Sequence, residues 1–396
     1  MTAAPAYLSA LGLVNPLGRG KAAVARGLFR GETGGLVLEE GWIPGRPARV
    51  GAVPGTLPEP PPHLAAYDSR NSRLLLAALE EIRDEVEAER ARYGPGRVGV
   101  VLGTSTSGVA ELEAAVARLE GGGDLPPGFS YPGQEMGAPA RFLARLLGLS
   151  GPAYTVSTAC TSSGKALAAA RNLLGLGLCD AVVAGGADSL CQLTVNGFTA
   201  LGAATAEPCN PMSAHRCGIN IGEGAALFVV RREPAPIALL GVGESSDAYH
   251  ISAPDPEGLG AEAAMRQALA DAGLDGSRVG YVNLHATGTD KNDEMESRAV
   301  ARVFPPGVPC GGTKALTGHL LGAAAATEMA FCWLALHPRW NPDGLLPPHR
   351  WDGVPDPALP GLRLVLPGAR DPDLRVCLSN AFAFGGGNLA LVAGRS

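Results

Sequence analysis

The chain has 396 residues, of which 46% are apolar and 18% charged, so it is long enough to bury two domain-sized cores. Its formal charge is −6 and its basic residues form no cluster, which argues against a nucleic-acid-binding surface. No stretch reaches the roughly 20 consecutive apolar residues of a membrane span and no secretory signal pattern is visible, so we expect a cytoplasmic globular protein.

Short apolar runs rich in β-branched residues alternate with alanine-rich stretches of helical periodicity. This alternation predicts an α/β protein with a largely buried sheet. Strands are expected at residues 7–13, 98–102, 181–184, 226–230, 237–242, 280–284, 375–378 and 389–392. Helices are expected at residues 72–90, 108–119, 140–147, 163–174, 261–272, 293–303 and 321–336. Segments 54–62, 121–128 and 338–360 are rich in proline or glycine and predict surface connections.

The two halves of the chain resemble each other weakly. Residues 100–104 and 280–287 each run from a strand into a turn of small residues, and the helix after Cys160 has a counterpart after His319. This similarity predicts two related α/β halves, residues 1–233 and 234–396. Facing loops of the two halves would bring Cys160, His285 and His319 to a common centre.

Cys160 lies in Val-Ser-Thr-Ala-Cys-Thr-Ser-Ser-Gly, where a strand is expected to turn into a helix. At such a position the helix dipole and unpaired amides favour a thiolate. His285 in Asn-Leu-His-Ala-Thr-Gly-Thr and His319 in Leu-Thr-Gly-His-Leu-Leu-Gly occupy comparably unusual settings. A cysteine alone is more often a small buried apolar residue. With two histidines it indicates a nucleophile beside two neutral polarising groups.

The other cysteines and histidines carry no such pattern. Eight cysteines show no Cys-x-x-Cys spacing, so neither a zinc site nor a disulfide framework is indicated, and seven of them are expected to be structural. The remaining histidines occupy loop-like settings and are expected at the surface: His63, His215, His250, His337 and His349.

Four segments carry a family resemblance. They are Thr158-Ala-Cys160-Thr-Ser-Ser163; His285 with Thr287, Thr289, Asp293 and Glu296; Lys314 and His319 with Glu328 nine residues on; and Asn380-Ala-Phe-Ala-Phe-Gly-Gly-Gly-Asn388. In order and spacing these segments resemble the β-ketoacyl-acyl-carrier-protein synthases I and II, which are condensing enzymes of the thiolase fold. The resemblance spans essentially the whole chain and implies a five-layered α-β-α-β-α arrangement.

The resemblance also implies an activity. Cys160 would accept an acyl chain from the phosphopantetheine arm of an acyl carrier protein. His285 and His319 would donate hydrogen bonds to the enolate that forms when malonyl-carrier protein loses carbon dioxide. The new carbanion would attack the acyl-Cys160 carbonyl, whose oxyanion would be held by the backbone N–H groups of Cys160 and Phe384. No metal or other cofactor is expected, because the pantetheine arrives on the carrier protein.

Supporting roles follow from the same resemblance. Lys314 and Glu328 would form a buried charge pair that orients His319. Phe384 would act as a mobile gate, and the residues expected to bind substrate are Thr287, Thr289, Phe382, Gly385, Gly386 and Ile219. Expected partners are an acyl carrier protein and, in a dimer, either an identical chain or a ketosynthase-like chain-length factor.

Some positions depart from the family pattern. Ile219 follows Asn-Pro-Met-Ser-Ala-His-Arg-Cys-Gly where an aromatic residue usually lines the malonyl site, and Gly387 replaces the usual threonine. The sequence around Ile219 is similar to the corresponding segment in ketosynthases of bacterial aryl-polyene pathways. Thr104, Thr106 and Ser107 are small and polar where a tunnel wall is expected, which suits a polar or polyene chain.

Two other classes of function remain open. A non-catalytic partner subunit, like a chain-length factor, would lack the nucleophile, and Cys160 argues against it. A cysteine hydrolase would pair Cys160 with one histidine and admit water to the acyl enzyme. The second histidine and the glycine-rich loop favour decarboxylative condensation over hydrolysis.

Overall fold

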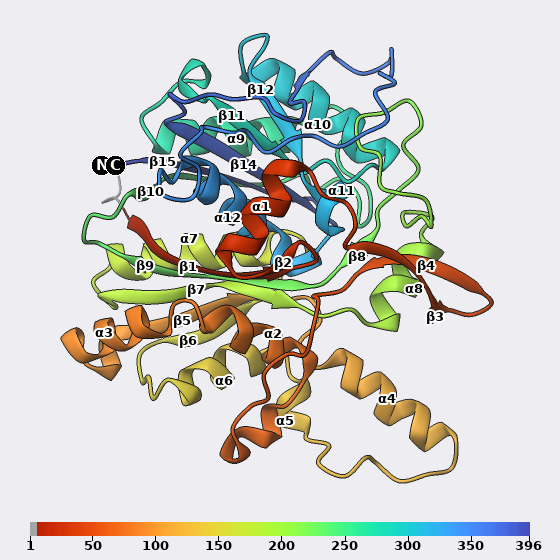
Figure 1. Ribbon diagram of the computed structural model, residues 1–396, viewed down its shortest axis with the longest axis vertical. Coiled ribbons are helices and arrows are strands. Elements are labelled where there is room, and N and C mark those ends of the chain that lie inside the picture. Colours follow the sequence, from red (N-terminus) through yellow and green to blue (C-terminus); the bar gives the residue numbers. More distant parts are fainter. Residues whose placement is uncertain (1–5) are drawn as a thin grey trace.

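The computed structural model describes residues 6–396, and its helices and strands form the five alternating layers expected from the sequence (Figure 1). Twelve strands belong to one continuous sheet whose two parts occupy separate layers, joined where β1 pairs with β10. The first part consists of β1 (Ala6–Asn15), β2 (Gly18–Arg19), β5 (Val98–Gly103), β6 (Ala153–Val156), β7 (Ala181–Asp188) and β9 (Gly224–Arg231). The second consists of β10 (Ile237–Ser246), β11 (Tyr281–Leu284), β12 (Pro309–Gly312), β13 (Arg363–Leu364), β14 (Val376–Ala383) and β15 (Gly387–Arg395).

The path through the large sheet is β13-β12-β11-β14-β15-β10-β1-β9-β7-β5-β6. Within each part, parallel strands (β5, β6 and β7; β11, β12 and β14) adjoin antiparallel ones, as expected for related halves. The division of the chain near residue 233 stays a prediction. A separate small sheet contains β3 (Leu36–Ile43), β4 (Arg46–Gly51) and β8 (Ile221–Gly222).

Helices fill the central layer and cover both outer faces (Figure 1). The central layer holds α7 (Ser162–Gly175) and α12 (Ala324–Leu336), with α1 (Lys21–Arg30) beside α12. One outer face carries α2 (Arg70–Leu79), α3 (Arg83–Tyr93) and α6 (Ala138–Leu146), and the other carries α9 (Leu259–Asp271) and α10 (Asp290–Val303). The remaining helices are α4 (Val109–Glu120), α5 (Tyr131–Gln134), α8 (Gln192–Ala200) and α11 (Lys314–Thr317).

Apolar packing is tightest in the central layer. Every residue of α12 is buried, so this helix is apolar on all sides as a core helix must be. α7 approaches it closely at Gly164, where a Cβ atom would lie 2.2 Å from Leu389 and 3.0 Å from Ala325. A larger residue would have to displace Leu389 and crowd Ala325, so glycine helps to bring the start of α7 and hence Cys160 against the C-terminal half.

The predicted strands are all confirmed, and one predicted helix is wrong in extent. Residues 72–90 form two helices, α2 and α3, with a break at residues 80–82. The break lets the Glu81 carboxylate accept hydrogen bonds from the backbone N–H groups of Leu13 and Lys21. Among the described residues, no helix is both long and apolar enough to cross a membrane.

Candidate active site

Cys160 lies in a tight turn between β6 and α7. Ala159 has a left-handed backbone, φ 50°, at the turn, and Cys160 is followed by Thr161, the N-cap residue of α7. The Ser162 hydroxyl fixes this turn, because it accepts a hydrogen bond from the Thr158 N–H (2.9 Å) and donates one to the Ala159 carbonyl. The thiol is buried and lies on the wall of a cavity of about 270 Å³.

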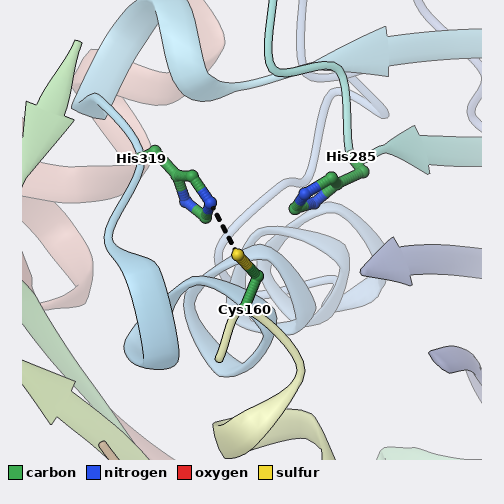
Figure 2. Close-up of side chains that lie close together, drawn as sticks. All are labelled: Cys160, His285 and His319. Carbon is green, nitrogen blue, oxygen red and sulfur yellow. Dashed lines mark hydrogen bonds between the residues drawn. The ribbon is translucent and has the colours of Figure 1, made fainter. Parts of the chain in front are cut away.

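Both histidines reach the same cavity from the other half. His285 follows β11 directly, and His319 follows α11. The sulfur of Cys160 lies 3.0 Å from Nε2 of His319, and the three side chains offer atoms that all lie within 4.8 Å of one another (Figure 2). The two imidazole rings stand edge to face with their centroids 5.3 Å apart. The structure therefore brings together the cysteine and histidines singled out from the sequence.

Hydrogen bonds at the far side of each ring set its tautomer. Nδ1 of His319 accepts a hydrogen bond from the Leu321 N–H (3.2 Å). Nδ1 of His285 lies 3.2 Å from the Lys314 ammonium, which can only donate hydrogen bonds. In each neutral ring the remaining proton must therefore be on Nε2. Both rings present an N–H donor to the cavity, which suits the stabilisation of an anion.

Lys314 and Glu328 form a buried ion pair behind His285. The ammonium donates to the Glu328 carboxylate, to the His285 carbonyl and to its Nδ1, so all three of its protons are used. The sequence-based expectation that this pair orients His319 is corrected here, because its hydrogen bonds go to His285. The reason is the position of Lys314 at the start of α11, which turns its side chain toward the end of β11.

Burial dominates the electrostatics of the site. It lowers the pKa of His285 and of His319 well below 6.5, and the nearby Lys314 charge lowers both further. Burial also raises the pKa of Cys160 to about 11, although Lys314 and the backbone N–H of Phe384 oppose this change. The expected preference for a thiolate is thus wrong for the resting site, where desolvation outweighs the helix dipole. Neutral imidazoles are as expected.

Glu296 holds the turn that carries His285. Its carboxylate accepts hydrogen bonds from the backbone N–H groups of His285 and Ala286, each 2.7 Å long. Ala286 has a left-handed backbone, φ 39°, and these two bonds compensate for the strain. Burial raises the pKa of Glu296 to about 7. Asp293 ties the same turn to the Asn210–Ile219 segment by accepting from the N–H groups of Gly288 and Met212.

Most of the expected substrate residues line the cavity. Thr287 and Thr289 lie on its wall with their hydroxyl oxygens 2.8 Å apart, and Ile219, Phe382 and Phe384 complete the apolar part. Gly385 and Gly386 do not line it; they form the turn after Phe384 with φ values of 88° and 77°. The backbone N–H groups of Phe384 and Cys160 favour a negative charge on the sulfur and so lower the pKa of Cys160.

Several wall residues were not found from the sequence, and Phe198 is the one that touches a predicted site residue. Phe198 on α8 packs against Phe384 with ring centroids 5.3 Å apart. The gate role of Phe384 stays a prediction. The apolar spacing within residues 192–200 was the available signal, but a short helix with one buried residue gives it weakly.

Two expectations about polar residues are corrected. Thr104 and Thr106 turn their hydroxyls to the buried Asp188, and Ser107 donates to the Glu135 carbonyl, so these groups support the fold and are not part of the cavity wall. His349 is buried, not at the surface. Its Nδ1 accepts from the Gly312 N–H and its Nε2 donates to the Pro211 carbonyl.

The cluster of one thiol and two imidazoles also has the composition of a metal site. A metal would need the Nε2 lone pairs, yet Leu321 and Lys314 donate to the opposite nitrogens and leave protons on Nε2. The arrangement therefore favours hydrogen-bond donation to a substrate over metal coordination.

Comparisons with known proteins give the family. The model described as beta-ketoacyl synthase, N-terminal domain, matches residues 58–235, and that of the C-terminal domain matches residues 237–346. The chain belongs to the beta-ketoacyl synthase family. It is 35% identical to nodulation protein E of a Rhizobium species, covering 91% of each chain. It is 30% identical to 3-oxoacyl-[acyl-carrier-protein] synthase 2 of Vibrio harveyi, covering 97% of each.

A solved structure of the same family is more similar in sequence. The ketosynthase ApeO, in complex with its chain length factor ApeC from Xenorhabdus doucetiae, is 44% identical, with a TM-score of 0.94. The match covers 99% of this chain and 98% of that chain. The thiolase-like, five-layered fold expected from the sequence is confirmed. As a beta-ketoacyl synthase, the protein is a condensing, acyl-transferring enzyme.

Proposed function

We propose that this synthase acts as a 3-oxoacyl-acyl-carrier-protein synthase that holds the growing chain on Cys160. In the first half-reaction the Cys160 sulfur bonds to the acyl carbonyl, the bond to the carrier sulfur breaks, and the thiol proton leaves with the carrier. The backbone N–H groups of Cys160 and Phe384, which favour negative charge at the sulfur, would hold the oxyanion. The single observation that carries the proposal is the convergence of Cys160 with two Nε2–H donors.

The second half-reaction uses the histidine pair. Malonyl-carrier protein loses carbon dioxide, and the electrons of the broken bond form an enolate whose oxygen accepts hydrogen bonds from His285 and His319. The enolate carbon then bonds to the acyl carbonyl, and the Cys160 sulfur leaves and takes up a proton. One well-placed donor commonly contributes about 2.7–4 kcal/mol in such a role. Thr287 and Thr289 lie on the wall where pantetheine amides would pass.

The alternatives fit the geometry less well. A thiol at hydrogen-bond distance from His319 is not expected in a non-catalytic subunit. A hydrolase needs a general base beside its nucleophile, but the Leu321 N–H occupies Nδ1 of His319 and the proton on Nε2 faces the sulfur. His319 is arranged to donate a proton, not to accept one.

A partner chain is part of the proposal. Among the described residues, β6 has a single strand neighbour and ends the large sheet, and its Tyr154 is 40% exposed. In another part of the chain, α4 presents Leu112, Val116 and Leu119 to solvent at helical spacing. Open sheet edges and exposed apolar helix faces are both typical of interfaces. Because ApeO is bound to a chain length factor, we infer that a ketosynthase-like chain of this kind covers the sheet edge at β6.

The pathway follows from the same comparison. Identity is 44% to the ketosynthase ApeO but 30% to 3-oxoacyl-[acyl-carrier-protein] synthase 2 of Vibrio harveyi, so we place the protein in a polyketide-type or aryl-polyene pathway and not in general fatty acid synthesis. An acyl carrier protein is the expected donor.

Intact-protein mass spectrometry tests the proposal directly. The purified chain, alone and with a chain-length-factor homologue, is mixed with a panel of acyl-carrier proteins and then with malonyl-carrier protein. A mass gain that maps to Cys160 and is discharged as a 3-ketoacyl product is expected. Absence of acylation by every donor, with folded protein and free thiol, would overturn the proposal.

A further inference from the structure

A buried carboxylate behind the cavity joins the two halves of the molecule. Asp188 ends β7, is fully buried, and accepts a hydrogen bond on Oδ2 from the Gly322 N–H (2.5 Å). Its Oδ1 accepts from the N–H groups of Ser105 and Thr106, 2.8 and 2.9 Å away, and from the hydroxyls of Thr104 and Thr106. Five donors therefore hold this carboxylate, and only the Gly322 N–H belongs to the C-terminal half.

Gly322 directly follows the residue that fixes the His319 ring. The Leu321 N–H donates to Nδ1 of His319, which leaves the ring proton on Nε2, and Nε2 lies 3.0 Å from the Cys160 sulfur (Figure 2). Leu321 has a left-handed backbone, φ 49°, which leucine rarely adopts, so neighbouring contacts must hold it there. The hydrogen bond from Gly322 to Asp188 is such a contact.

Packing at Gly322 shows how closely this turn follows the carboxylate. A Cβ atom built on Gly322 would lie 2.8 Å from the Asp188 carboxylate and 2.8 Å from the Ser105 hydroxyl. Gly322 does not have a left-handed φ, so its backbone conformation would admit other residues. The close approach to Asp188 is therefore the reason for glycine at this position.

The backbone of His319 is anchored independently of Asp188. Its N–H donates to the Asn220 carbonyl (2.7 Å), and its carbonyl accepts from the Gly222 N–H (3.0 Å). These bonds fix where the side chain begins but not how the ring turns about its side-chain bonds. The orientation of the ring depends on the Leu321 N–H, and hence on the turn that Asp188 holds.

We propose that Asp188 is a positioning residue for His319: by holding the turn at Gly322, it keeps the Nε2–H donor of the ring pointed into the cavity. This inference rests on the proposed function, because that donor serves the enolate formed from malonyl-carrier protein. Asp188 does not line the cavity, so it acts only through the turn. Breaking its bond to Gly322 should slow the half-reaction that uses the histidine donors and largely spare acyl transfer to Cys160.

Two variants, called the link variants here, break this bond from opposite sides. Asp188→Asn has one acceptor oxygen in place of two, so either Gly322 or the donors at residues 104–106 must face its NH2 group. Gly322→Ala keeps the carboxylate but adds a Cβ atom 2.8 Å from it, which must push the turn away. Thr106→Val is the matched control, because it removes one donor to the same carboxylate and leaves the Gly322 bond in place.

The two half-reactions are measured separately in each variant. We expect both link variants to release carbon dioxide from malonyl-carrier protein about tenfold or more slowly than wild type. Acylation of Cys160 by an acyl-carrier protein, followed by intact mass, should stay close to the wild-type rate. Thr106→Val should keep both rates near wild type, although it is less stable to denaturant.

A measurement without substrate separates positioning from stability. In protein with isotope-labelled histidines, NMR of the ring nitrogens shows which nitrogen of His319 carries the proton. The His319 signals are identified by their absence in His319→Ala. Wild type and Thr106→Val should show the Nε2–H form alone, whereas the link variants should show a mixture of Nε2–H and Nδ1–H forms.

Equal losses in the two half-reactions, or an Nε2–H form that persists alone in the link variants, would overturn the inference. The same selective loss in Thr106→Val would also overturn it, because the Gly322 bond is intact there. If one link variant does not fold, the other carries the test. A wild-type chain that decarboxylates no malonyl-carrier protein would overturn the proposed function instead, and the NMR result would still decide whether Asp188 positions His319.

Discussion

Replacing Lys314 with methionine tests how the buried ion pair serves the histidines. The ammonium makes three hydrogen bonds, to Glu328, to Nδ1 of His285 and to the His285 carbonyl. Lys314→Met leaves the Glu328 carboxylate buried without its cation, a change that typically costs about 3–5 kcal/mol of unfolding free energy. It also frees Nδ1 of His285, so the ring no longer has to present Nε2–H to the cavity.

The loss of unfolding free energy in Lys314→Met should grow as the pH rises. Burial already raises the pKa of Glu328 to about 7 with Lys314 present, and Lys314 lowers it. Without the lysine the folded-state pKa rises further above its unfolded value, so stability is lost as pH rises through the folded pKa. The variant should therefore be least impaired near pH 5 and most impaired near pH 9, as measured by denaturant unfolding at each pH.

A second substitution separates stability from catalysis. Glu328→Gln in the Lys314→Met background removes the buried charge, so it should restore most of the unfolding free energy and remove the pH dependence that Glu328 causes. The rate of malonyl decarboxylation should stay about 100-fold or more below wild type in both variants, because one fixed donor is lost. Recovery of the rate together with the stability would refute the argument that Lys314 sets the His285 tautomer.

Four further results are expected. Cys160→Ala should remove the mass gain from acyl-carrier proteins altogether, and acylation that persists would mean another nucleophile. His319→Ala should slow malonyl decarboxylation more than acyl transfer; equal losses in the two half-reactions would show that its donor role is misassigned. Burial raises the pKa of Cys160 to about 11, so the rate at which iodoacetamide alkylates this residue should rise about tenfold per pH unit between pH 7 and 9, as measured by peptide mass. A rate that levels off near pH 7 would contradict that pKa. Asp188→Asn places an amide among five donors that now converge on the carboxylate, so it should cost about 1–3 kcal/mol in denaturant unfolding; an unchanged midpoint would show that the site relaxes.

The parts of the site predicted from the sequence are those fixed by local patterns. His285 follows an apolar strand that gives way to a turn of small residues, and Cys160 lies among small residues before an alanine-rich helix; both patterns are visible without tertiary contacts. The partner of Lys314 was not visible in this way. Lys314 forms hydrogen bonds with His285 and not with His319 because of the way α11 lies against β11, and only the folded chain determines that arrangement.

Elements without strong periodicity escaped prediction. The strands β3, β4 and β6 lie at sheet edges or in the small sheet and carry exposed residues, so the buried-strand pattern fails there. His349 looked like a surface residue because prolines precede it, yet its two ring nitrogens join residues 211 and 312, far apart in sequence. The pKa of Cys160 was misjudged for a related reason, since burial arises from the whole fold.

The central helix α12 bears on how the protein can be divided. Family models split the chain between residues 235 and 237, but α12 belongs to the second part and its Trp333 indole donates a hydrogen bond to the Leu8 carbonyl of β1 in the first. One apolar cluster runs from β1 and β9 through α12 to β14 and β15. The two halves should consequently unfold in one cooperative transition. Fragments cut at this boundary would expose that cluster and should aggregate unless the two parts fold together.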